Sequence, residues 1–176
     1  AQVLPYSSKT TYQKVTVKFS TLNYNQLAGI VALGNVSLRA ESNLIKNSEN
    51  LPIAQRGIEA TGGVNAYILN NQVLRHRRIP ADLANPAHGI LLNAAAQSTV
   101  LTNVLNYNDV GIRVVGSQKI TVKANNIRSS TTDGILVDDA NGLASTANTI
   151  WANDSGKNGT NGITLQSING LVTKNV

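Results

Sequence analysis

A Gly-Ile pair recurs six times along the chain, and this repeat constrains the fold more than any other feature of the sequence. The residue two places after each Ile is again apolar, so apolar side chains alternate along each segment. This period of two predicts that each pair opens a β-strand with one buried face. The six pairs begin at Gly29, Gly57, Gly89, Gly111, Gly134 and Gly162.

An Asn column follows the first five glycines at a constant distance of 14 residues. We expect the Asn side chains to form a ladder of hydrogen bonds, in a turn whose left-handed backbone conformation Asn tolerates. We expect Ile90, Ile112 and Ile135 to stack in a second, apolar ladder. The Asn column consists of Asn43, Asn71, Asn103, Asn125 and Asn148.

The length of the repeat selects among the known repeat folds. The shortest intervals between glycines are 22 and 23 residues, which accommodate three strands of four to five residues and three turns. The Leu-x-x-Leu-x-Leu signature of leucine-rich repeats is absent. Aromatic residues make up only 4% of the chain, so the core must consist of stacked aliphatic side chains. We therefore predict an all-β fold, a right-handed parallel β-helix: a single-stranded three-sided solenoid with about six coils of 22–32 residues.

The pattern Gly-Ile followed by Asn-x-Ile resembles the right-handed β-helix repeats of the pectate-lyase-like superfamily. The resemblance extends from Gly29 to the C-terminus. It implies this fold and its ladders of stacked side chains, and it is not specific for one function.

The segment before the repeats has a pattern of its own. Val15, Val17 and Phe19 alternate with polar residues, which predicts a strand. We expect residues 1–28 to form an N-terminal cap or an incomplete first coil, because the end of a β-helix exposes unpaired backbone. Residues 29–176 should form the β-helix. The sixth copy stops at Val176, and we expect the solenoid to continue or to dock against another subunit there.

The loops differ in length at one corner of the expected solenoid. The intervals from each Asn to the next Gly are 14, 18, 8, 9 and 14 residues. Copies three and four should therefore form a low floor between two walls, residues 75–88 and residues 151–161. Three coil spacings, roughly 14 Å, would separate the walls, which is enough for a polysaccharide chain. Loops on a rigid scaffold are frequent sites of function.

Several side chains on these loops could bind a ligand. Arginine side chains bind planar oxyanions through two parallel hydrogen bonds, and an outward-facing Trp can stack on a sugar ring. The candidate catalytic residues, as proton acceptors near the groove, are His76, Asp109 and Asp154. The candidate ligand-binding residues are Arg75, Arg77, Arg78, Tyr107, Arg128 and Trp151.

No motif assigns a reaction to the chain. His88-Gly-Ile90 and Thr132-Asp-Gly134 resemble short stretches of polygalacturonases, but both fall on the repeat itself and in the reverse order. We interpret Asp138 and Asp139 as turn residues and expect neither a metal site nor a cofactor. The Arg-x-Pro-x-x-Arg signature of pectate lyases and the Asp-Pro-His signature of alginate epimerases are absent.

Charge and composition limit the partners. The net charge of +6 suits an anionic partner, whereas aromatic platforms for nucleic acid are too few and no apolar run of 18 residues could span a membrane. The leading hypothesis is an extracellular or cell-surface module that binds or processes an anionic polysaccharide or cell-surface glycan. The alternative is a structural or adhesive subunit without catalysis, resembling a virion tailspike or a filament protein, that self-associates through its helix ends.

Overall fold

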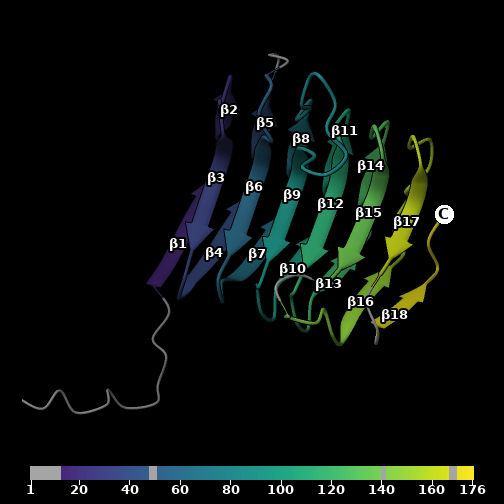
Figure 1. Ribbon diagram of the computed structural model, residues 1–176. Helices are drawn as coiled ribbons and strands as arrows, with labels where there is room; N and C mark the ends of the chain where they lie inside the picture. Colours follow the sequence, from purple (N-terminus) through teal and green to yellow (C-terminus); the bar gives the residue numbers. More distant parts are fainter. Residues whose placement is uncertain (1–12, 48–50, 140–141, 167–169) are drawn as a thin grey trace, which may run out of the picture.

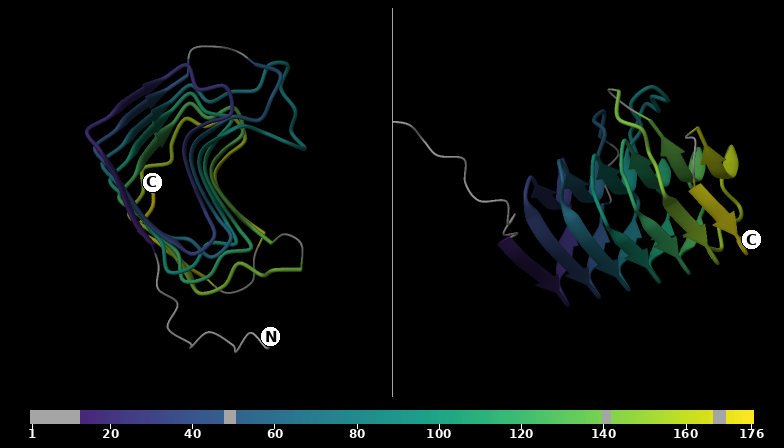
Figure 2. Two further views of the ribbon diagram at one scale, coloured as in Figure 1. Left: turned by 90° about the vertical axis from the view of Figure 1, so that its left-hand side faces the viewer. Right: turned by 90° about the horizontal axis from the view of Figure 1, so that it is seen from below.

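The computed structural model describes residues 13–47, 51–139, 142–166 and 170–176, which form eighteen strands and no helix (Figure 1). The strands belong to three sheets, and every pair of neighbouring strands is parallel. The chain visits the three sheets in turn and then starts the next coil, so the coils stack along one axis (Figure 2). This arrangement confirms the predicted all-β, parallel β-helix architecture.

Each of the first five coils adds one strand to each sheet, and the sixth adds a strand to the first and third sheets only. The first sheet contains β1 (Gln13–Lys18), β4 (Val36–Glu41), β7 (Asn65–Leu69), β10 (Thr99–Leu101), β13 (Thr121–Lys123), β16 (Asn148–Trp151) and β18 (Gly170–Thr173). The second sheet contains β2 (Thr21–Asn23), β5 (Leu44–Lys46), β8 (Gln72–Leu74), β11 (Val104–Asn106) and β14 (Asn126–Arg128). The third sheet contains β3 (Ala28–Leu33), β6 (Arg56–Thr61), β9 (His88–Asn93), β12 (Val110–Val115), β15 (Asp133–Asp138) and β17 (Asn161–Leu165).

The Ile column lies in register along the inside of the third sheet. Ile90 is paired with Ile112, and Ile112 with Ile135, and all three side chains are fully buried. Aliphatic side chains from the other two sheets, such as Val122 and Ile127, complete the core. Stacked aliphatics replace the aromatic residues that an ordinary core of this size would contain.

The glycines before the isoleucines are required by close packing at the corner between the second and third sheets. A Cβ added to Gly57 would lie 2.2 Å from Val73 Cγ1 and 2.5 Å from the carbonyl oxygen of Gly89. At Gly111 the corresponding distances, to Ile127 Cγ2 and to the Gly134 carbonyl oxygen, are 2.3 and 2.5 Å. Only glycine leaves room for the two sheets to approach this closely.

An Asn ladder occupies the corner between the first and second sheets. The Oδ1 atom of Asn103 accepts hydrogen bonds from the backbone N and the Nδ2 of Asn71, at 2.8 and 3.0 Å. Asn125 accepts the same pair of bonds from Asn103, at 2.9 and 3.0 Å. The ladder runs through Asn43, Asn71, Asn103, Asn125, Asn153 and Asn175.

The assignment of Asn148 to this ladder is wrong. Asn125 bonds to Asn153, whereas Asn148 opens β16 and accepts a hydrogen bond from the backbone N of Ile120. The fifth copy contains extra residues between β15 and β16, so its ladder residue lies 19 rather than 14 residues after Gly134. Asn148 matched the spacing because Asn is so frequent, with 23 in the chain.

The left-handed backbone conformation expected for the ladder Asn is also wrong. The left-handed conformation belongs to the residue before each ladder Asn, as at Asn70 (φ 55°), Thr102 (φ 54°) and Ala124 (φ 52°). The ladder Asn itself is selected by its amide, which bonds to the coils on both sides.

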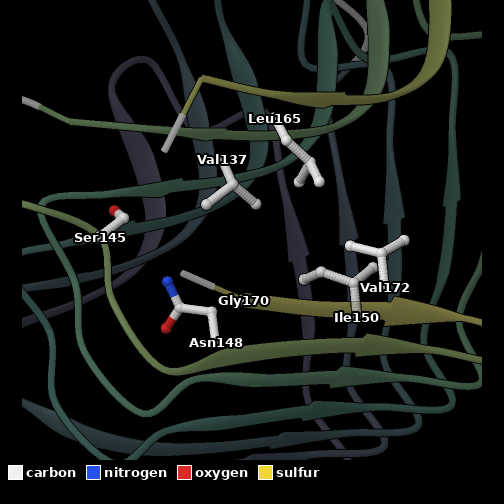
Figure 3. Close-up of a pocket in the computed structure, with 7 residues that line it drawn as sticks. All are labelled: Val137, Ser145, Asn148, Ile150, Leu165, Gly170 and Val172. Carbon is white, nitrogen blue, oxygen red and sulfur yellow. The ribbon is translucent and has the colours of Figure 1, made fainter. Parts of the chain in front are cut away.

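The two ends of the solenoid are less covered than its middle. Within the expected N-terminal segment 1–28, residues 13–23 supply β1 and β2 and residues 24–27 lead into β3, whereas residues 1–12 lie outside the described residues. At the other end a cavity of about 120 Å³ opens between the inner faces of the last strands (Figure 3). It is lined by Val137, Ser145, Asn148, Ile150, Leu165, Gly170 and Val172.

Candidate functional site

The groove expected between two walls is not formed, because the two long insertions lie at different corners. Residues 75–87 connect the second sheet to the third, whereas residues 139–147 connect the third sheet to the first. Residues 151–161, expected to form the second wall, comprise the end of β16, the ladder residue Asn153 and a short turn into β17. Once Asn153 is the ladder residue, only nine residues separate it from Gly162, as in the short copies.

The arginines at residues 75–78 do not act together as a clamp. Arg75 is exposed, while the Arg77 guanidinium donates a hydrogen bond to the carbonyl of Ser129 at 3.0 Å and lies 5.7 Å from the ring centroid of Tyr107. Arg78 forms an ion pair with Asp82 inside the same insertion, at 2.6 Å. The corner between the second and third sheets therefore retains two arginines without an ion pair among the described residues, together with the half-exposed Tyr107.

His76 is a structural residue rather than a groove residue. It is fully buried, and both its backbone N and its Nδ1 face Asn108 Oδ1, at 3.0 and 3.3 Å. Burial lowers the pKa of His76 to about 4, and the hydrogen bond to Asn108 opposes this shift only in part. A neutral imidazole enclosed in the corner is inaccessible to a polymeric substrate.

The candidate carboxylates are also engaged. Asp109 is 4% exposed, and its Oδ2 accepts hydrogen bonds from the backbone N of Arg78 at 2.8 Å and of Ala87 at 3.1 Å. It therefore anchors both ends of the 75–87 insertion. Asp154 forms an ion pair with Arg128 on the outside of the second sheet. Both carboxylates are thus already engaged in contacts within the chain.

Trp151 does not join the arginines. It lies in β16 of the first sheet, next to Lys123 of β13 in the register, and its ring contacts Lys123 and Lys174. The structure thus brings Arg75, Arg77, Tyr107 and Arg128 to neighbouring coils of one corner and places Trp151 on another side of the solenoid.

A polar cluster that the sequence did not single out lies on the outer face of the third sheet. Arg113 of β12 donates to both carboxylate oxygens of Asp138, at 2.7 and 3.3 Å. The Nη1 of the same guanidinium lies 3.5 Å from His88 Nε2. Arg56 and Glu59 form an ion pair on this face, with Nε and Oε2 3.4 Å apart. Strands β6, β9, β12 and β15 therefore contribute titratable side chains to one surface.

This outer face is recessed over coils three to five. Val31, in the first coil, is 49% exposed, as expected for a side chain that points outward. The outward side chains of β9, β12 and β15 are far less exposed: His88 2%, Leu91 5%, Val110 1%, Val115 4% and Asp138 7%. The third sheet bows toward the interior, and the 75–87 insertion projects beside the corner at which its strands begin (Figure 2). Coils three to five are also the coils that carry the two long insertions.

The electrostatics of the recess keep His88 neutral. Burial, followed by the charges of Arg113 and Arg56, lowers the pKa of His88 to about 3. Arg113 donates toward Nε2 of His88, so Nε2 must be the acceptor of the neutral imidazole and Nδ1 must carry its proton. Nδ1 is buried and has no partner among the described residues. The recess thus presents the partly buried guanidinium of Arg113, which is held by the carboxylate of Asp138 and by Nε2 of His88.

The signal for this face was present in the sequence. Charged residues or His occupy outward strand positions in four consecutive copies, at Arg56, His88, Arg113 and Asp138. We interpreted His88 as part of the Gly-Ile repeat and Asp138 as a turn residue. The second interpretation is wrong, because Asp138 is the last residue of β15 and forms an ion pair with Arg113. Among the described residues no cluster of His, Asp and Glu could hold a metal ion, and no helix is long and apolar enough to span a membrane.

Comparison with solved structures shows the same fold in larger chains. A double mutant of the periplasmic alginate epimerase AlgG matches with a TM-score of 0.75 and 13% identity, covering 90% of this chain and 38% of that one. The AlgG structure without these mutations gives a TM-score of 0.63 at 14% identity, covering 92% of this chain and 39% of that one. The A-module of the Azotobacter vinelandii mannuronan C-5 epimerase AlgE4 gives 0.53 at 18% identity, covering 91% and 54%.

At these identities the likeness shows the fold alone, and the chain spans about two fifths of the AlgG chains and about half of the AlgE4 module. No curated protein matches the sequence. The family described as "Right handed beta helix region" matches residues 7–175, nearly the whole chain. The match confirms the predicted handedness and the predicted resemblance to pectate-lyase-like β-helices, and the chain belongs to the right-handed β-helix family.

Proposed function

We propose that the outer face of the third sheet binds a polysaccharide chain. The observation that carries this proposal is the contact of Arg113 with Asp138 and His88 in a recess of outward-facing side chains. Concave sites with a few convergent polar groups are typical of ligand binding, and charged planar groups hydrogen-bond strongly to hydroxyl and carboxylate oxygens. The stacked coils continue the face along the solenoid axis, which suits an extended ligand.

We infer further that the polysaccharide is acidic. Arg75 and Arg77 form no ion pair among the described residues, and they lie at the corner that leads directly into β9 of the recessed face. The whole chain carries a net charge of +6, which attracts polyanions at long range. AlgG and AlgE4 are alginate and mannuronan epimerases, so uronate polymers are the polysaccharides to test first. Since AlgG is periplasmic, we also propose a periplasmic or extracellular location; the comparisons give no support to a virion.

The proposal is restricted to binding. A general base works best when its pKa lies near the operating pH, and a pKa of about 3 makes His88 a weak base. We therefore assign to His88 the positioning of the Arg113 guanidinium through Nε2, not the removal of a proton.

Affinity gel electrophoresis with polymannuronate or neutral dextran in the gel tests the proposal. Polymannuronate should retard the native chain, and Arg113→Gln should reduce this retardation while urea unfolding confirms that the variant is folded. Lys46→Gln, which removes one charge from the second sheet, is the matched control and should be retarded like the native chain. Equal retardation of both variants, or none of the native chain, would refute the proposal.

A second candidate function is self-association through the C-terminal end of the solenoid. Leu165 and Val172 belong to inward-facing columns, yet they are 48% and 38% exposed, and the neighbouring Leu171 is 59% exposed. Apolar surface of this kind, beside the unpaired edges of β17 and β18, favours association. Light scattering should detect oligomers that disappear when Leu171 and Val172 are replaced by Glu. A monomer at high protein concentration would reject this candidate.

A further inference from the structure

The outer face of the first sheet carries an aromatic and cationic cluster separate from the recessed face. Trp151 of β16 is paired with Lys123 of β13 and with Thr173 of β18, so these three residues occupy one outward column. Lys174 directly follows β18. The first and third sheets form different sides of the solenoid, so a ligand at this column would not occupy the third-sheet site (Figure 2).

The side chains of two lysines lie close to the indole ring of Trp151. Lys123 Nζ lies 3.9 Å and Lys174 Nζ 5.7 Å from the ring centroid of Trp151. Among the described residues neither lysine forms an ion pair. Glu41 is the single acidic side chain on the described strands of this sheet. It lies four coils away from Trp151 and is already paired with Lys18 and Arg39. The cluster therefore carries two positive charges that no carboxylate of the described residues neutralises.

The physical properties of this cluster point to an anionic sugar. An exposed cation–π contact contributes only about 0.5–1 kcal/mol, which offsets part of the repulsion between two ammonium groups near one ring. A single negative charge placed between the ammonium groups would be attracted by both. The indole offers an apolar surface for sugar C–H groups, and the hydroxyls of Thr149 and Thr173 lie in adjacent outward positions.

We propose that Trp151, Lys123 and Lys174 form a second glycan site, which binds one sugar residue that carries a carboxylate or a sulfate. The sugar ring stacks on the indole, and its anionic group lies between the two ammonium groups. A membrane surface is disfavoured, because Thr121, Thr149 and Thr173 interrupt the apolar outward residues and an interfacial surface requires a continuous apolar face.

The single Trp of the chain makes the test direct, because all indole fluorescence comes from this site. Oligogalacturonate supplies the carboxylate arm and a heparin-derived oligosaccharide the sulfate arm, with dextran as the neutral probe. At least one acidic probe should change the fluorescence in a saturable way, and dextran at equal concentration should not. The arm that responds identifies the anionic group.

Matched double variants separate a site from general charge attraction. Lys123→Gln with Lys174→Gln should weaken the titration about tenfold. Lys46→Gln with Lys157→Gln removes the same charge elsewhere and should leave it unchanged. Equal weakening in both double variants, no response to either acidic probe, or a stronger response to phosphatidylglycerol vesicles would overturn the proposal. Arg113→Gln should leave the titration intact, so this site and the third-sheet site can fail independently.

Discussion

Two corners flank the second sheet: the first corner joins it to the first sheet, and the second corner joins it to the third sheet. Both use the same kind of turn, but they differ in turn length and in their buried polar residues. In both, a residue with positive φ precedes a buried polar residue, as in Thr102-Asn103 and Tyr107-Asn108. At the first corner every described turn has the same length, and the Asn side chains bond without interruption from coil to coil. At the second corner the polar residue changes from coil to coil, and the turns range from short to the 75–87 insertion.

The second corner also concentrates unsatisfied polar groups. Ser130 Oγ has no partner among the described residues, which interrupts the column after Asn108. Each other residue with a buried side-chain polar atom that lacks such a partner belongs to this corner or borders it, and none is a ladder Asn. These residues are Asn25, Gln55, Arg56, His76, Arg77, His88 and Asn106. The uniform first corner therefore links the coils cooperatively. The irregular second corner leaves some hydrogen bonds unmade, and its turn length and polar residue vary from coil to coil.

The largest expected difference between the corners concerns their Asn residues. Asn103→Leu removes the acceptor of two bonds from Asn71 and the donor to Asn125, and each buried group left unpaired costs about 1–3 kcal/mol. Asn108→Leu leaves chiefly the backbone N of His76 and the carbonyl of Val73 unpaired. Urea unfolding should show the larger loss of stability for Asn103→Leu. Equal losses would remove the distinction between an uninterrupted and an interrupted ladder.

The next expected effect is a dependence of stability on pH that arises at the irregular corner. His76 has a pKa of about 4 in the folded chain, against 6.5 for an ordinary His, so the unfolded chain binds protons first as the pH falls. The free energy of unfolding should therefore decrease below pH 6.5, by about 1.4 kcal/mol per pH unit for each such His, until the pH approaches the folded pKa.

His76→Asn should flatten this profile, because Asn occupies the corresponding position at Asn108 and does not titrate. His88, whose pKa is about 3, adds a parallel contribution that this variant retains. Urea unfolding at pH 7, 6 and 5 measures both profiles. Native and His76→Asn chains with identical slopes would show that burial at this corner does not depress the pKa of His76.

A smaller effect is expected at the anchor of the insertion. Asp109→Ala removes the acceptor for the backbone N of Arg78 and of Ala87 and should cost about 1–3 kcal/mol. Hydrogen exchange should accelerate at these two amides and remain unchanged at Asn71 and Asn103 of the uniform corner. Acceleration at both corners would mean that the two regions unfold together.

The smallest effect is expected at the exposed Arg75. Arg75→Gln should change the free energy of unfolding by no more than about 0.5 kcal/mol, because the side chain is exposed. The same substitution should weaken the dependence of polymannuronate binding on salt, since screening acts on the lost charge. A loss of stability without any change in binding would assign Arg75 to the scaffold.

These corners also show how far the sequence predicts the molecule. Periodicity identified the fold and the buried ladder through Ile90, Ile112 and Ile135, because stacking requires the same residue type at the same interval. It failed at Asn148, where an insertion at the third corner moved the true ladder residue to Asn153. Periodicity also failed to predict the contact of His88 with Arg113. That contact depends on which side of the solenoid the loops enclose, and the length of a loop does not show the side from which it projects.

The left-handed position before each ladder Asn has a consequence for engineering. The backbone there is fixed by the Asn that follows, while the side chain varies freely among Asn70, Thr102, Ala124 and Lys174, all of which are exposed. Successive positions are spaced by one coil, about 4.8 Å. Charged residues, cysteines or dyes placed at these positions would therefore be spaced by whole multiples of the coil spacing, and the Asn ladder beneath them would be undisturbed.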